Sequence, residues 1–226
     1  MNHPKMLSGS SLKMLAAICM FIDHLYCLVL NCFAQTALCE NLCRGIGRLS
    51  FPIFCFLLTE GFLHTSNRAR YAARLCIFAI LSEFPYDLAF SETFSFLHSQ
   101  NVFFTLLIGL LVLWGIQYFS RKYFLQAGVC VLGAAVCVLF GCDYGWQGIL
   151  LIAVLYFFRQ DSFSMTLAGV SVCLLWSWEA AFAFLPIHFY NKQRGWMNRP
   201  SAKYAFYFFY PLHLLFLVWM QKILCV

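Results

Sequence analysis

Charged residues are scarce in this chain of 226 residues, because Asp, Glu, Lys and Arg together make up 11% of it, whereas about a quarter is usual in soluble domains. Hydrophobic residues make up 62%, and Phe, Tyr and Trp alone make up 19%. So little polar surface cannot cover a water-facing globule. The composition therefore excludes a soluble domain and predicts a protein that works within a lipid bilayer or at its surfaces.

The chain also lacks the length for a large domain outside the bilayer. One spanning helix needs about 20 apolar residues, so nine spans use about 180 residues and leave roughly 46 for all loops and both ends. We predict one transmembrane domain over residues 1–226: an all-α, polytopic helical bundle of about nine transmembrane helices. Whether the eighth segment spans or re-enters is left open. The apolar segments are residues 12–33, 46–66, 70–90, 101–119, 124–141, 146–158, 164–178, 180–190 and 205–225.

Several familiar catalytic and metal-binding motifs are missing. The absence of G-x-S-x-G, H-E-x-x-H and a P-loop argues against a lipase-like enzyme, a zinc protease and an ATP-driven pump. The 12 cysteines include no C-x-x-C and no Cys/His set with zinc-finger spacing. We therefore expect no metal site. Cys32, Cys39 and Cys43 fall together near one loop, and the sequence leaves open whether a single disulfide forms there.

The basic residues form short clusters between apolar segments, not a stripe with interleaved aromatics, so we expect no nucleic-acid partner. If the N-terminus is cytoplasmic and all nine segments cross, 12 of the 15 Lys and Arg fall on the cytoplasmic side, and only Arg44, Arg48 and Lys222 fall opposite. The positive-inside rule expects such a split. The charge pattern therefore predicts a cytoplasmic N-terminus.

Ionisable residues inside the spans are costly and are candidates for a functional site. Glu60 and His64 share a helix face at i,i+4, and Glu83 and Asp87 share another. A structural role as ties between helices is the alternative for each residue. Taken together, their density in a short chain favours a function. The whole set is Asp23, His24, Arg48, Glu60, His64, Glu83, Asp87, Asp143 and His213.

The predicted topology sorts the polar residues by depth. Asp23, His24 and His213 fall near the midplane. An acidic outer half contains Glu83, Asp87, Asn101, Thr105, Asp143 and Tyr144. A basic inner mouth contains Glu60, His64, Arg68, Arg70, Arg74, Asn191, Arg194 and Lys203. A basic mouth suits an anionic cytoplasmic substrate.

Eight sequence blocks in order resemble the TraX family, which is named after the pilin acetylase of conjugative transfer systems. The resemblance implies an integral protein of a bacterial-type cytoplasmic membrane, an acyltransferase that uses acetyl-CoA. The family is distantly similar to the broader membrane acyltransferases, in which a first-helix histidine is the expected base; His24 matches it, whereas Lys13 stands where that group tends to have arginine. The blocks are residues 22–24, 47–54, 60–65, 82–87, 101–106, 143–145, 190–195 and 209–213.

The leading hypothesis is transfer of an acetyl or short acyl group from CoA to an amine or hydroxyl of a small molecule or peptide. His24 would be the general base, with Asp23, Glu83 or Asp87 orienting it and His213 as a second candidate. Arg68, Arg70, Arg74, Asn191, Arg194 and Lys203 would bind the CoA end. The polar path would be lined by Arg48, Glu60, His64, Asn101, Thr105, Asp143 and Tyr144. The alternative is a proton-coupled secondary transporter that uses the same intramembrane carboxylates and histidines.

Overall fold

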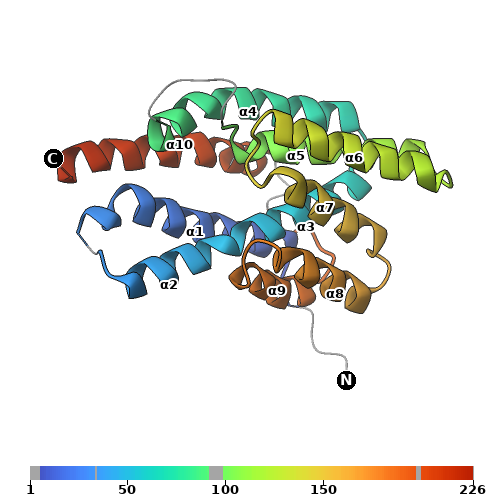
Figure 1. The fold of residues 1–226 in the computed structure, drawn as a ribbon, viewed down its shortest axis with the longest axis horizontal. Helices are drawn as coiled ribbons and strands as arrows, with labels where there is room; N and C mark the ends of the chain where they lie inside the picture. The colour runs from blue at the N-terminus through green and yellow to red at the C-terminus, as the bar shows by residue number, and fades with distance from the viewer. Residues whose placement is uncertain (1–5, 34, 92–98, 197–199, 226) are drawn as a thin grey trace.

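All regular secondary structure is helical in the computed structural model, which describes residues 6–33, 35–91, 99–196 and 200–225. The side chains of residues 200–203 are also not described. Within the described ranges the only extended pairings are two isolated bridges, Leu7 with Tyr190 and Gln100 with Cys142. The prediction of an all-α fold is therefore confirmed (Figure 1).

The helices follow the predicted apolar segments closely. The first segment is α1 (Gly9–Leu28) with a 3₁₀ turn, η1 (Leu30–Cys32), and the eighth is η2 (Glu179–Ala183) with α9 (Phe184–His188). The other helices are α2 (Ala37–Arg48), α3 (Ser50–His64), α4 (Arg68–Phe90), α5 (Val102–Tyr118), α6 (Tyr123–Leu139), α7 (Gly145–Phe157), α8 (Ser162–Cys173) and α10 (Pro200–Leu224).

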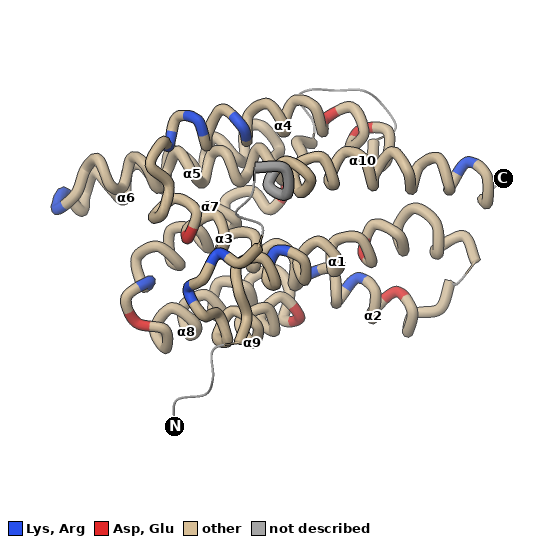
Figure 2. Tube along the Cα trace, turned by 180° about the vertical axis from the view of Figure 1, so that it is seen from behind, with Lys and Arg blue, Asp and Glu red and all other residues tan. Residues whose placement is uncertain are grey.

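The connections between helices gather at two ends of the molecule. The α5–α6 and α7–α8 turns and the start of α4 lie toward one end, whereas the α1–α2 connection and the C-terminus lie toward the other (Figure 1). We call the first the basic end, since Lys and Arg are concentrated there in Figure 2. The second is called the opposite end below.

Three stretches of the described chain are long and apolar enough to cross a membrane: Gly9–Cys32, Ala37–His64 and Tyr204–Leu224. Four further apolar helices, α5 to α8, have 12 to 17 residues. Large hydrophobic side chains face outward, among them Phe124, Leu139 and Phe163, which are 90%, 79% and 75% exposed. Such surfaces are consistent with contact with a lipid bilayer.

The eighth segment is too short to cross the hydrocarbon core alone. Its five 3₁₀ residues and five α-helical residues extend about 17 Å, whereas the core is about 30 Å thick. The segment nevertheless returns the chain toward the basic end, because Tyr190 pairs with Leu7, just before α1.

The sequence prediction missed α2 as a separate helix; it is amphipathic, and most of it lies before residue 46, the predicted start of the second segment. The break between α2 and α3 falls at Leu49. A proline ring clashes with the carbonyl four residues earlier in a continuous helix, and Pro52 stands four residues after Arg48. Together α2 and α3 still form one apolar stretch of 28 residues.

The core is built mainly by α3, α5 and α7. Their fully buried side chains include Phe51 and Phe62 of α3, Leu110 of α5, and Ile149 and Leu155 of α7. α1 packs on α3 of this core, and α10 packs on α4 and α1, so residues far apart in the sequence are brought together there. These two helices supply the central residues of the site described below.

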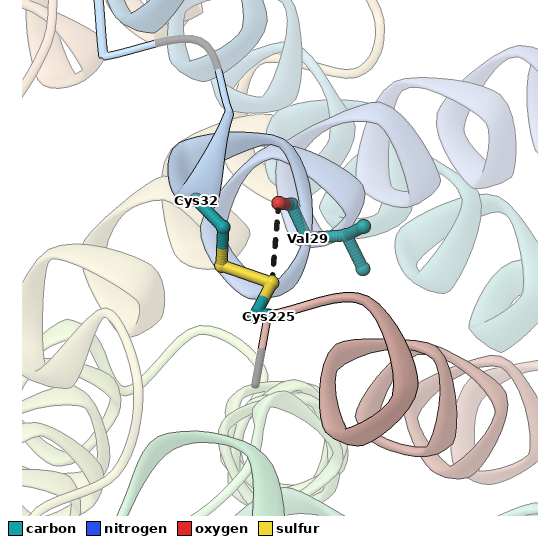
Figure 3. The surroundings of a disulfide bond; sticks show 3 residues. All are labelled: Val29, Cys32 and Cys225. Carbon is teal, nitrogen blue, oxygen red and sulfur yellow. Dashed lines mark hydrogen bonds between the residues drawn. A yellow bond between two sulfur atoms is a disulfide. The ribbon is translucent and has the colours of Figure 1, made fainter.

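A disulfide joins the end of the α1 segment to the end of α10 (Figure 3). It links Cys32 to Cys225, with a Cα–Cα distance of 5.8 Å. Cys39 and Cys43, which the sequence grouped with Cys32, are free thiols. The sequence did not indicate this pairing, because no local pattern points to a cysteine 193 residues away.

Candidate functional site

Two histidines from the first and last helices form a hydrogen-bonded pair. Nδ1 of His24 lies 2.7 Å from Nε2 of His213, and the two rings are parallel with centroids 5.0 Å apart. His213 is 5% exposed, whereas His24 is partly exposed. The two residues predicted to compete for one role are thus brought together as a unit, which we call the histidine pair.

The hydrogen bonds of this pair set its tautomers. Nδ1 of His213 lies 2.8 Å from the carbonyl oxygen of Phe209, which can only accept, so this nitrogen donates. In a neutral imidazole the other nitrogen is then an acceptor, so Nε2 of His213 accepts from Nδ1 of His24. Nε2 of His24 consequently has the free lone pair. This is the arrangement of a general base oriented by a second residue.

Asp23 was predicted to orient His24, but the structure pairs it elsewhere. Its Oδ1 accepts from Nη1 of Arg44 at 2.9 Å, and the same nitrogen lies 2.7 Å from Sγ of Cys27. The hydrogen-bond partner of His24 is His213 and not a carboxylate. Arg44 was not selected from the sequence, because only the packing of α2 against α1 brings it to Asp23.

The predicted carboxylate pair of α4 ties helices together. Both members are buried, Glu83 at 1% and Asp87 at 4% exposure. Glu83 accepts from the side-chain amide of Asn101 at 2.5 Å, and that amide also donates to the Ala79 carbonyl at 2.9 Å. Oδ1 of Asp87 is 3.5 Å from the Ser91 hydroxyl. Glu83 therefore holds the start of α5, and these hydrogen bonds engage both carboxylates with groups other than His24.

Further predicted path residues meet at the α6–α7 connection. The Thr105 hydroxyl donates to the backbone carbonyl of Asp143, and the Arg48 guanidinium lies beside the Tyr144 hydroxyl. The Tyr144 ring stacks on Phe51 with centroids 3.6 Å apart. Burial raises the pKa of Asp143 to about 6, although hydrogen bonding and the nearby Arg48 act in the other direction. This connection is thus packed onto the core through Tyr144 and joined to α5 and α2 by polar contacts.

A pocket of about 360 Å³ opens at the basic end. Glu60 and His64 of the predicted inner mouth line it, together with Arg70, Arg74 and Arg194. Lys13, Lys192 and three tyrosines (Tyr71, Tyr190 and Tyr207) also line it and were not assigned to the donor site from the sequence. We call this the basic pocket. Its lysines and arginines surround one concave surface, which can bind a polyanion.

Two residues predicted to bind CoA do not line the basic pocket. The Arg68 guanidinium stacks over the Phe62 ring at 4.7 Å, so it packs on the core. The Asn191 side chain accepts from the backbone N–H of Gln193 at 2.9 Å and serves a turn. The side chain of Lys203, the third predicted contact, lies outside the described residues. Sequence position alone could not separate these residues from Arg70, Arg74 and Arg194.

The loop that contains Arg194 is fixed to the start of α1. Backbone N–H groups of Gly9 and Ser10 donate to the carbonyls of Gln193 and Arg194 at 2.8 and 3.0 Å. The first N–H groups of a helix have no partner within it, so these bonds satisfy two of them. Nη2 of Arg194 also donates to the His64 carbonyl at 2.6 Å. One wall of the basic pocket is therefore anchored to α1 and α3.

An apolar groove continues from the basic pocket toward the histidine pair. The two share Lys13, Leu57, Tyr71 and Tyr207, and the groove also contacts Phe103 and Tyr210. The Tyr210 ring centroid is 6.2 Å from that of His24 and 5.7 Å from that of His213. Basic pocket, apolar groove and histidine pair therefore follow one another along the inside of the bundle.

No group of three His, Cys, Asp or Glu side chains in the described part of the chain is close enough to hold a metal ion. The described residues themselves offer acid–base chemistry at the histidine pair and anion binding at the basic end.

Comparison with known proteins gives one family. The family model described as TraX protein matches residues 8–221. Among curated proteins, the "Probable fimbrial assembly protein FimC, serogroup H1" of Dichelobacter nodosus is 29% identical over 234 residues, which cover 92% of this chain and 93% of that protein. No solved structure matches the chain.

Proposed function

The chain belongs to the TraX family, and we propose that it is a membrane-embedded acyltransferase. It moves an acetyl or short acyl group from acyl-CoA to an amine or hydroxyl acceptor. The observation on which the proposal rests is the continuity of the basic pocket, the apolar groove and the histidine pair. That sequence of surfaces matches a donor with a phosphorylated end, a long thin arm and a reactive thioester.

The donor phosphates would contact Arg70, Arg74, Lys192 and Arg194 at the basic pocket. Arginine is suited to phosphate, because its planar guanidinium offers two parallel N–H donors. The pantetheine arm would follow the apolar groove past Lys13 and Tyr207. The thioester would then reach Tyr210, next to the histidine pair.

The proposed reaction needs one proton relay at His24. Its Nε2 takes the proton of the acceptor amine or hydroxyl as the acceptor attacks the thioester carbonyl. The C–S bond then breaks, and the departing CoA sulfur receives the proton from His24, so the enzyme returns to its starting state. His213 keeps Nδ1 of His24 protonated throughout and supports the imidazolium.

We further propose that the basic end faces the cytoplasm. The concentration of Lys and Arg there supports this orientation. The Cys32–Cys225 disulfide lies at the opposite end, and disulfides persist in oxidising compartments outside the cytoplasm. In this arrangement the chain runs nine times between the two sides, with η2–α9 as a short return that does not cross the whole core.

The fimbrial assembly name of the Dichelobacter nodosus relative supports a peptide acceptor on the outer side. A small-molecule acceptor uses the same chemistry, and a screen of candidate amines and hydroxyl compounds separates the two.

The test is turnover of radiolabelled acetyl-CoA by the purified protein in nanodiscs. Release of free CoA with transfer of label to an added acceptor is the expected result. Proton-driven solute uptake into proteoliposomes, without any consumption of acetyl-CoA, would instead support a secondary transporter.

A further inference from the structure

One aromatic residue lies where the apolar groove meets the histidine pair. Tyr210 belongs to the lining of the groove, and it is 4% exposed. Its ring meets the Phe103 ring edge-on, with centroids 5.2 Å apart. It also presents this ring to both members of the histidine pair. The same side chain therefore closes the inner end of the groove.

The other side of Tyr210 is polar. The ring meets His24, which is partly exposed and follows Asp23 in α1. It also packs on Phe103, two residues after Asn101, whose side-chain amide donates to buried Glu83. Ion-paired Asp23 and Arg44 nearby keep 22% and 36% of their side chains exposed. Tyr210 thus stands between an apolar groove and a polar region that is partly open.

We propose that the Tyr210 ring is the barrier that keeps the outer aqueous side separate from the groove. The role of this barrier rests on the proposed acyltransferase function, whereas its position in the fold does not. An acyl thioester in the groove would react with water as well as with the acceptor if water entered freely. A closed active site excludes this side reaction. Tyr210 then determines that the acyl group goes to an acceptor bound at the histidine pair and not to water.

The proposed side reaction is hydrolysis. Water adds to the thioester carbonyl, the C–S bond breaks, free acid forms, and the CoA sulfur takes up the proton. No further reactant is needed. The packing of the ring, and not its hydroxyl group, provides the barrier, so Phe at this position retains it and Ala removes it.

The geometry is tested with a cysteine placed in the groove. Ala17 lines the groove from α1 and is 4% exposed, so Ala17→Cys adds one sulfur at low cost. A membrane-impermeant thiosulfonate is added to either side of oriented proteoliposomes, and peptide mass spectrometry reads position 17 separately from the native cysteines. Lys122→Cys, in the α5–α6 turn, identifies the basic side.

With Tyr210 present, the thiol introduced by Ala17→Cys should not be modified from the side opposite the basic end. Tyr210→Ala should make modification from that side at least about tenfold faster, whereas Tyr210→Phe should leave it unchanged. Phe208→Ala is the matched control: it removes another aromatic ring of α10, one that meets the Phe78 ring edge-on and is not part of the groove lining. It should not admit the reagent from the opposite side.

Hydrolysis of acetyl-CoA without acceptor gives the second readout, which should rise in Tyr210→Ala and not in Phe208→Ala. Modification of the introduced thiol from the opposite side while Tyr210 is present would overturn the proposed barrier, and this measurement does not depend on whether the Ala variant folds. An unchanged modification rate in a folded Tyr210→Ala protein would also overturn it. A protein that consumes no acetyl-CoA overturns the acyltransferase instead, and the labelling still decides the barrier.

Discussion

At the scale of single residues, the arrangement of His24 and His213 gives the histidines different roles. The Phe209 carbonyl accepts from His213, and His213 accepts from His24, so only His24 has a free basic nitrogen. In the proposed reaction His213 acts through His24, so we expect it to be a positioning residue. The sequence named both histidines but could not predict their pairing, because they lie 189 positions apart.

The first prediction concerns His213. His213→Ala should lower kcat by roughly tenfold or more, because His24 loses the acceptor that fixes its tautomer and ring, while the affinity for CoA stays unchanged. Acetyl transfer and CoA binding are measured on the same nanodisc preparation. The control is His188→Ala, which removes an exposed histidine of α9. A raised Kd for CoA with unchanged kcat would place His213 in the donor site.

The second prediction concerns the basic pocket. Arg70 lines the pocket with an exposed side chain, and Arg70→Ala should raise the KM for acetyl-CoA by roughly tenfold, since a hydrogen bond to a charged group is worth about 1.5–3 kcal/mol. A remote contact binds the ground and transition states alike, so kcat should change little. Lys122→Ala, outside the pocket, should have no effect. Equal KM values for the two variants would argue against phosphate binding at this pocket.

The sequence could identify the type of residue at the basic mouth but not each member. Arg68, Arg70 and Arg74 all belong to the first two turns of α4. Only Arg70 and Arg74 face the pocket, while Arg68 stacks on Phe62. The difference depends on helix rotation, which is set by tertiary packing. Asp23 illustrates the same limit, because its partner Arg44 lies on a helix that hydropathy did not reveal.

At the scale of helices, the close approach of α1 and α2 depends on a glycine. A Cβ atom at Gly47 would lie 2.4 Å from Cβ of Asp23. Small residues permit such approaches between membrane helices. The approach keeps Asp23 next to Arg44, so Gly47 positions the ion pair beside His24, the next residue of α1.

The third prediction uses a pair of glycines. Gly47→Ala should destabilise the protein by about 1–3 kcal/mol, because the added methyl group forces α1 and α2 apart. Gly128→Ala in α6 is the control, because nothing lies within 4 Å of its added Cβ and alanine favours a helix by about 1 kcal/mol. Thermal unfolding in one detergent compares the two. If Gly47→Ala were as stable as Gly128→Ala, the proposed close packing would be wrong.

Hydropathy predicted nearly all the helices, because each membrane segment must satisfy its backbone hydrogen bonds internally. It missed α2 for a physical reason. Glu40, Asn41, Arg44 and Arg48 lower the apolar content of this helix, although its leucines and isoleucine form one face. Residues 180–190 were left open, and the structure makes this segment a 3₁₀ turn followed by a short helix.

At the scale of the whole molecule, the charge distribution and the disulfide both support the proposed orientation, with the basic end in the cytoplasm. The fourth prediction is that an impermeant thiol reagent labels Lys122→Cys from the cytoplasmic side and Leu38→Cys from the outer side. Both side chains are exposed, and they belong to the basic end and to the start of α2, respectively. Native Cys32 and Cys225 should resist labelling until a reductant is added. Labelling of both introduced cysteines from one side would contradict the orientation.

The measurement that tests the central claim most directly compares wild type and His24→Ala for acetyl transfer and CoA affinity in nanodiscs. General-base assistance is worth about 10²–10⁴-fold, so kcat should fall by roughly that factor. The Kd for CoA should stay near the wild-type value, because the basic pocket lies at the other end of the groove. Wild-type turnover by a folded His24→Ala protein would contradict the account.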